Sequence, residues 1–106
     1  MNNLVAIITP TFKRVSTGEL DRCIQSVDAQ LYDGWKHYII GDNCPELASY
    51  IHKLETHDRH VKSGKRVLLN LPKNHNDLGV TPLNYGISIS IEPYWCVLAD
   101  DNYWKE

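Results

Sequence analysis

Two adjacent carboxylates, Asp100 and Asp101, follow a short apolar run in the stretch "VLADDNYW", residues 97–104. Two like charges about 4 Å apart repel by roughly 4 kcal/mol at an effective dielectric near 20. A divalent cation reverses the sign of that energy, and hard oxygen ligands suit Mg²⁺ or Mn²⁺. The ion could then hold the diphosphate of a nucleotide, which bare carboxylates would repel. The alternative is an acidic loop that is simply solvated. The pair is therefore a candidate metal site.

Other polar side chains also stand where apolar runs end. Thr9, Pro10 and Thr11 close the apolar run at 4–9, and Asp42 follows the run at 37–40. In a parallel sheet with helices on its faces, ligands bind beyond the carboxyl ends of the strands. If all these runs are strands of one such sheet, residues far apart in sequence meet along one rim. The pattern thus predicts a single site.

The elements that would position this rim alternate along the chain. Apolar runs predict strands over 4–9, 37–40, 66–71 and 95–99. Apolar residues at helical spacing predict helices over 17–31, from Pro45 through Leu54, and over 82–91. A capping box formed by Ser16 and Glu19 is expected to begin the first helix. The order β-α-β-α-β-α-β predicts an α/β fold, with a mostly parallel sheet between two helical layers.

Two stretches between these elements are predicted to be polar loops, at 57–65 and 73–80. His57 and His60 fall in the first, where we expect solvated side chains in preference to metal ligands. Gly86 weakens the prediction of a helix over 82–91. We expect the last strand near a sheet edge, where Trp95, Val97 and Trp104 would lack cover, and predict self-association into a homo-oligomer.

Length and charge narrow the function classes. The chain has 106 residues, which predicts one domain over 1–106, and its net charge of −2 argues against a general nucleic-acid or anionic-membrane binder.

Cys23, Cys44 and Cys96 have no disulfide-framework or zinc-ligand spacing, so we expect free thiols and a cytoplasmic location. No apolar run is long enough to span a bilayer. The loop TPTFKR has no glycine, so dinucleotide and P-loop motifs are absent.

Three segments, in order, resemble family 2 glycosyltransferases. "VAIITPTFKR" is similar to their opening strand and loop, and "LDRCIQSVDAQLYDGWKHYIIGDNCPE" to the next helix and strand, through Ser26, Val27 and Gln30. "NDLGVTPLNYGISISIEPYWCVLADDNYW" is similar to the segment that leads into the DxD-type motif, through Asn84 and Gly86. The resemblance covers almost the whole chain.

The resemblance implies a Rossmann-like GT-A fold and a nucleotide-diphosphate sugar as donor, commonly a UDP- or GDP-sugar, with Mn²⁺ or Mg²⁺. By position it implies nucleotide-sugar contacts from seven residues: Thr9, Pro10, Thr11, Arg14, Asp42, Asn84 and Asp100. Asp101, together with Asp100, would bind the metal.

The sequence departs from the family pattern at three positions. Gly41 stands where the family often has a first acid, Leu83 where it often has arginine before Asn-x-Gly, and Asn102 at the third DxD position. Family members are also longer, and their second half supplies the acceptor site and, in inverting enzymes, the catalytic base. We therefore expect this chain to be the N-terminal, donor-binding part of a longer glycosyltransferase, and we assign no catalytic base.

Three interpretations remain from the sequence. The first is a glycosyltransferase domain that binds the donor through a metal for transfer to a hydroxyl acceptor. The second is a non-catalytic nucleotide-binding or interaction module, favoured by Leu83 and Gly41. The third is a flavodoxin-like binding domain without a metal. Turnover of a nucleotide sugar, and its loss in Asp101→Ala, would separate the first from the second.

Overall fold

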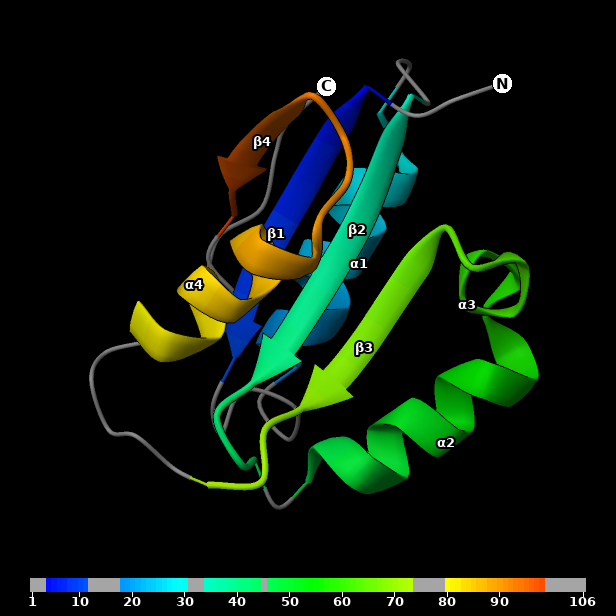
Figure 1. Cartoon of the computed structure of the whole chain (residues 1–106). Coiled ribbons are helices and arrows are strands. Elements are labelled where there is room, and N and C mark those ends of the chain that lie inside the picture. The colour runs from blue at the N-terminus through cyan, green and yellow to red at the C-terminus, as the bar shows by residue number, and fades with distance from the viewer. Residues whose placement is uncertain (1–3, 12–17, 31–33, 45, 74–79, 99–106) are drawn as a thin grey trace.

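A computed structural model describes residues 4–11, 18–30, 34–44, 46–73 and 80–98. Its sheet has four strands in the order β3-β2-β1-β4, and every pair of neighbours is parallel (Figure 1). The strands are β1 (Val5–Thr11), β2 (Trp35–Gly41), β3 (Arg66–Asn70) and β4 (Tyr94–Val97). The predicted α/β fold with a parallel sheet is confirmed.

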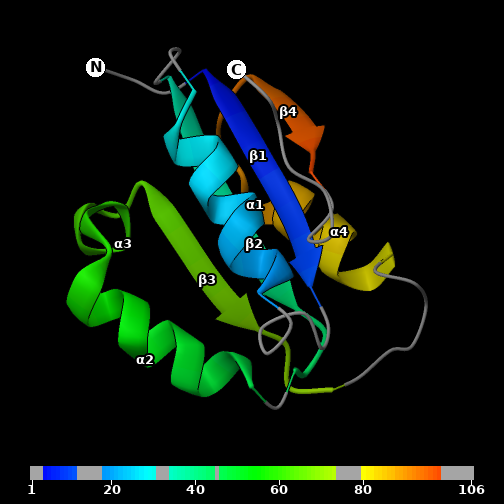
Figure 2. The same cartoon turned by 180° about the vertical axis from the view of Figure 1, so that it is seen from behind.

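Helices cover both faces of this sheet. α1 (Glu19–Asp28), α2 (Leu47–His57) and α3 (Arg59–Ser63) lie on one face, and α4 (Val80–Ile89) lies on the other, as the two opposite views show (Figures 1 and 2). Leu20, Ile24 and Leu47 pack on Ile39 on the first face. Ala6, Ile8 and Ile40 face the apolar side chains of α4 on the second. The architecture is therefore three-layered, as the alternation predicted.

β1 extends two residues beyond the end that the sequence predicted. Pro10 and Thr11 still pair with Ile40 and Gly41. Thr11 O accepts from the Asp42 N–H at 3.1 Å, so alternation points the backbone of Pro10 toward β4. Among residues 4–11 and 80–98, the last bond on that side runs from Leu98 N–H to Ile8 O at 3.0 Å, and the next would need an N–H that proline lacks. Pro10 therefore limits the β4 ladder and leaves the β2 ladder intact.

α1 is shorter than predicted, and its start differs. The helix begins at Glu19, and its N-cap is Gly18, with φ 78° and no capping side chain. A positive φ of this kind is readily adopted by glycine. The predicted capping box of Ser16 and Glu19 is therefore wrong, because the N-cap is Gly18, two residues beyond Ser16. Ser16 itself lies outside the described residues. The helix also ends at Asp28, before residue 31.

The predicted polar loop at 57–65 is also wrong in part. It contains α3, whose start is capped by Asp58, with Oδ1 accepting from the His60 and Val61 N–H groups at 2.8 and 3.4 Å. Gly64, with φ 85°, ends this helix. The aspartate N-cap and the glycine that follows are normal helix boundaries, and five residues are too few to show an apolar periodicity.

α4 starts at Val80 and continues through Gly86. A Cβ on Gly86 would lie 2.6 Å from Ile8 Cγ2, so the missing side chain lets the helix pack closely on β1. The glycine that weakened the prediction is thus what brings this helix onto the sheet.

β4 forms the edge of the described sheet, next to β1. Trp95 is 53% exposed and Val97 44% exposed, and Tyr94 and Ile91 nearby are also exposed. Trp104 lies outside the described residues.

None of the helices in the described ranges has the length and hydropathy needed to cross a bilayer.

Candidate functional site

The carboxyl ends of β1 and β2 bring the predicted rim residues together. Thr11 pairs in register with Gly41, and the N–H of Asp42 donates to the Thr11 carbonyl at 3.1 Å. Thr11 is 3% exposed and Asp42 is 5% exposed. Two residues that are 31 positions apart in sequence therefore form one polar end of the sheet.

The Thr11 hydroxyl is buried at this end. Its Oγ1 has no hydrogen-bond partner among the residues that the structure describes. A buried hydroxyl without a partner costs about 1–3 kcal/mol, so such a group calls for an explanation, for example a bound ligand or an ordered water. Thr11 Oγ1 is therefore available to a polar ligand at the rim.

The loop after β2 is fastened to the end of β3. The Asn70 side chain accepts from the Cys44 N–H at 2.8 Å and donates to the Cys44 carbonyl at 3.0 Å. The Leu71 N–H donates to the Gly41 carbonyl at 2.8 Å. The chain segment that carries Asp42 is thus bound on one side by β1 and on the other by β3.

Thr9 lies below the rim. Its side chain is fully buried, and its Oγ1 is 2.8 Å from His37 Nε2. That hydroxyl is therefore bound within the sheet layer, and Thr9 supports the rim without lining it. Asn84 is exposed on α4.

Three of the predicted site residues lie outside the described residues: Arg14, Asp100 and Asp101. The chain approaches the acidic pair through Leu98, which is 4% exposed and bonded through its N–H to Ile8 O at 3.0 Å. In the strand order β3-β2-β1-β4, connections go to opposite sides of β1, so the switch point lies between β1 and β4. This is where parallel α/β sheets bind ligands. In the sequence, Asp100 and Asp101 follow Leu98 after one intervening residue.

A buried polar network that the sequence analysis missed crosses the sheet from β1 to β3. Arg66, whose side chain is wholly inaccessible, donates from Nε to His37 Nδ1 at 3.1 Å. Its two terminal nitrogens bind Asp58 at 2.8 Å and Asp28 at 2.7 Å. Because Nδ1 accepts, the neutral His37 carries its proton on Nε2 and donates to Thr9. Burial, and then the charge of Arg66, lower the pKa of His37 well below its ordinary value. The signal visible in the sequence was a titratable residue, His37 or Arg66, at the start of the apolar runs at 37–40 and 66–71.

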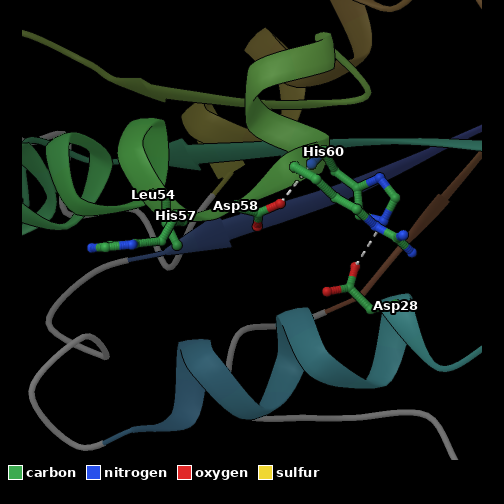
Figure 3. A pocket seen from close by; sticks show the side chains of 6 residues that line it. Asp28, Leu54, His57, Asp58 and His60 are labelled. Atoms are coloured by element: carbon green, nitrogen blue, oxygen red, sulfur yellow. Dashed lines mark hydrogen bonds and ion pairs between the residues drawn. The ribbon is translucent and has the colours of Figure 1, made fainter.

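A pocket of about 310 Å³ lies beside this network (Figure 3). Its lining residues are Asp28, Leu54, His57, Asp58, Arg59 and His60. Asp28 ends α1 and Arg66 begins β3, so the pocket lies at the amino ends of the strands, away from the rim. Burial lowers the pKa of His60 despite the Asp28 carboxylate 3.8 Å away. The pocket carboxylates already bind Arg66, and no metal-ligand cluster of three His, Cys, Asp or Glu occurs within the described ranges.

The comparisons with known proteins agree with this geometry. No protein-family model matches the chain. An uncharacterized glycosyltransferase, R139, of Acanthamoeba polyphaga mimivirus is 30% identical over 97 residues, covering 81% of this chain and 39% of that protein. The resemblance to the N-terminal half of a glycosyltransferase is confirmed.

Solved structures of S. aureus TarS show the same GT-A glycosyltransferase fold. The crystal structure of TarS 1–349 superposes with a TM-score of 0.76 at 15% identity, over 94% of this chain and 28% of that one. The same protein in complex with UDP, and in complex with UDP-GlcNAc, gives a TM-score of 0.75 at 14% identity in each case. The chain thus spans less than two-fifths of the relatives that it matches.

Proposed function

We propose that this chain is the nucleotide-sugar-binding part of a family 2-type glycosyltransferase. Its donor would be a nucleotide-diphosphate sugar carrying uridine or guanosine, used for transfer of a glycosyl group to a hydroxyl acceptor. The observation that carries the proposal is the joining of Thr11 and Asp42 at the carboxyl ends of neighbouring parallel strands. The UDP and UDP-GlcNAc complexes of the similarly folded TarS support it.

The rim residues have separate roles in this proposal. Asp42 contacts the base or ribose, and the free hydroxyl of Thr11 provides a donor or acceptor beside it. Pro10, near the end of β1, and Arg14, three residues beyond that strand in the sequence, would flank the nucleotide, and Asn84 would contribute from α4. Thr9 contributes from below, by way of its bond to His37.

Asp100 and Asp101 would hold a Mn²⁺ or Mg²⁺ ion at the switch point between β1 and β4. Paired carboxylates fit such an ion, because hard oxygen ligands suit it and because the cation relieves their mutual repulsion. When bound, the ion would act as a Lewis acid that stabilises the leaving nucleoside diphosphate. The residues of this chain bind and orient the donor.

A second candidate is a nucleotide-binding module without turnover. Gly41 favours it, because a side chain there could be placed only by displacing the ends of the Leu47 and Asn70 side chains, which disfavours the first acid often found at this position in the resembled family. Incubation with UDP-GlcNAc and Mn²⁺ separates the two candidates. Release of free sugar that Asp101→Ala abolishes supports the enzyme. Binding without release supports the module.

We also propose that the chain forms a homo-oligomer and acts in the cytoplasm. The exposed side chains of β4, Trp95 and Val97 among them, would be covered by a second copy, and sedimentation of a dimer at micromolar concentration would support this. A monomer would contradict it. Cys23, Cys44 and Cys96 form no disulfide bond in the structure, and such reduced cysteines fit a proposed action in the reducing cytoplasm.

A further inference from the structure

At the end of β3, the side chain of Asn70 makes the two backbone hydrogen bonds that a neighbouring strand would otherwise make. Its Oδ1 accepts from the Cys44 N–H at 2.8 Å, and its Nδ2 donates to the Cys44 carbonyl at 3.0 Å. One amide side chain thus pairs with both backbone groups of a single residue, as a neighbouring backbone would. Both groups belong to the short segment 42–44, which joins β2 to α2 and carries Asp42.

This contact depends on Gly41. Gly41 and Asn70 are register partners in the β2–β3 ladder. A Cβ on Gly41 would lie 2.6 Å from Asn70 Oδ1 and would also collide with Leu47 Cδ2. Distances of this kind are not found for real Cβ atoms, so any side chain at position 41 would displace the Asn70 amide or the Leu47 side chain. The glycine therefore leaves the space through which Asn70 reaches Cys44.

The segment so held includes one residue in an uncommon conformation. Asn43 has φ 55°, the left-handed region that asparagine adopts more readily than most residues. Asp42, just before it, is fixed from the other side by its N–H bond to Thr11 O at 3.1 Å. The backbone around Asp42 is thus bound to β1 and β3 before any ligand arrives, which lowers the ordering cost of binding.

We infer that Asn70 is a positioning residue for the nucleotide site, acting through Gly41 and segment 42–44 to orient Asp42. The inference rests on the proposed function. It also gives a physical reason for the glycine at position 41, since an acid and the Asn70 contact cannot occupy the same space. Asp42 is therefore the carboxylate that this segment offers to the base or ribose.

The test compares Asn70→Ala with the matched control Tyr38→Phe, which removes the bond from Tyr38 to Glu92 on the other face of the sheet. Calorimetry measures the Kd of each variant of the 106-residue chain for UDP and for inorganic pyrophosphate, both with Mn²⁺. Asn70→Ala should weaken UDP binding about tenfold and leave the pyrophosphate Kd within twofold, because Asp42 faces the nucleoside while the metal holds the phosphates. Tyr38→Phe should leave both within twofold.

Hydrogen exchange supplies the second measurement. The Cys44 amide should exchange at least tenfold faster in Asn70→Ala than in the wild-type chain, while the β1 and β2 amides keep their protection. A wild-type UDP affinity in Asn70→Ala, or an equal loss for UDP and pyrophosphate, would overturn this inference alone. A wild-type chain that binds neither UDP nor GDP would overturn the proposed function, and with it the role of Asn70 in that site.

Discussion

Arg66 Nε donates to His37 Nδ1 at 3.1 Å in the buried layer between the sheet and α1. The same guanidinium reaches Asp58 at the start of α3 and Asp28 at the end of α1. One side chain therefore joins β2, β3 and two helices, and through His37 it reaches Thr9 in β1. Arg66 and its two carboxylate partners lie at the amino ends of the strands, opposite the rim, and His37 connects them to Thr9 just below the rim. The network therefore stabilises the sheet that carries the site.

Arg66→Ala should lower the free energy of unfolding by about 3–5 kcal/mol, because it leaves the largely buried Asp58 carboxylate and His37 without their partner. Arg66→Lys should not restore stability, since lysine cannot direct three donors along the fixed directions of a guanidinium. Urea unfolding measures both, with the exposed Arg59→Ala as control. Wild-type stability in Arg66→Lys would contradict the structural role given to the guanidinium.

The stability of the protein should fall as the solution becomes acidic. His37 stays neutral in the folded chain because burial and Arg66 lower its pKa, whereas in the unfolded chain it protonates near pH 6.5. The unfolded state therefore takes up the proton first, and stability is lost as pH falls below about 6.5, by up to roughly 1.4 kcal/mol per pH unit. His60, whose pKa is also lowered, adds a change of the same sign.

Unfolding in urea at pH 7.5, 6.5 and 5.5 checks this, because His37→Gln should flatten the dependence that the wild-type chain shows. His52→Gln, at an exposed position on α2, should leave the dependence unchanged. An equal slope in the wild-type chain and in His37→Gln would show that His37 is not kept neutral by the fold.

Thr11→Val separates binding from folding at the rim. Valine has nearly the shape of threonine and removes a buried hydroxyl that bonds no described residue, so the free energy of unfolding should stay the same or rise. Affinity for UDP should fall by about tenfold, which corresponds to roughly 1.4 kcal/mol. Thermal unfolding and calorimetry measure the two quantities. Loss of stability with an unchanged Kd would mean that the hydroxyl serves the fold.

The sequence predicted the strands well because each is a continuous apolar run bounded by proline, glycine or charge. It placed Thr11 and Asp42 at one rim because the ends of parallel strands must meet. The predicted start of α1 was wrong because two local patterns competed, the capping box at Ser16 and the glycine at position 18. In the structure Gly18 is the N-cap, with a positive φ. α3 was missed because it is too short for a periodic signal.

Long-range side-chain contacts could not be predicted. The Arg66 network joins residues up to 38 positions apart, and a charged residue at the start of an apolar run does not show which partners it will meet. Asn70 was counted as part of a strand, since no local pattern shows that its amide will pair with Cys44. Gly41 was noted only as a departure from a family pattern, and its contact with Asn70 became visible with the coordinates.

The most direct measurement of the central claim is calorimetric titration of the chain with UDP, with and without Mn²⁺, beside Asp101→Ala and Asp42→Ala. The account predicts binding that requires the metal, is lost in Asp101→Ala and is weakened in Asp42→Ala. Binding of equal strength in all three proteins, or no binding of UDP or GDP by the wild-type chain, would contradict a nucleotide-sugar site at this rim.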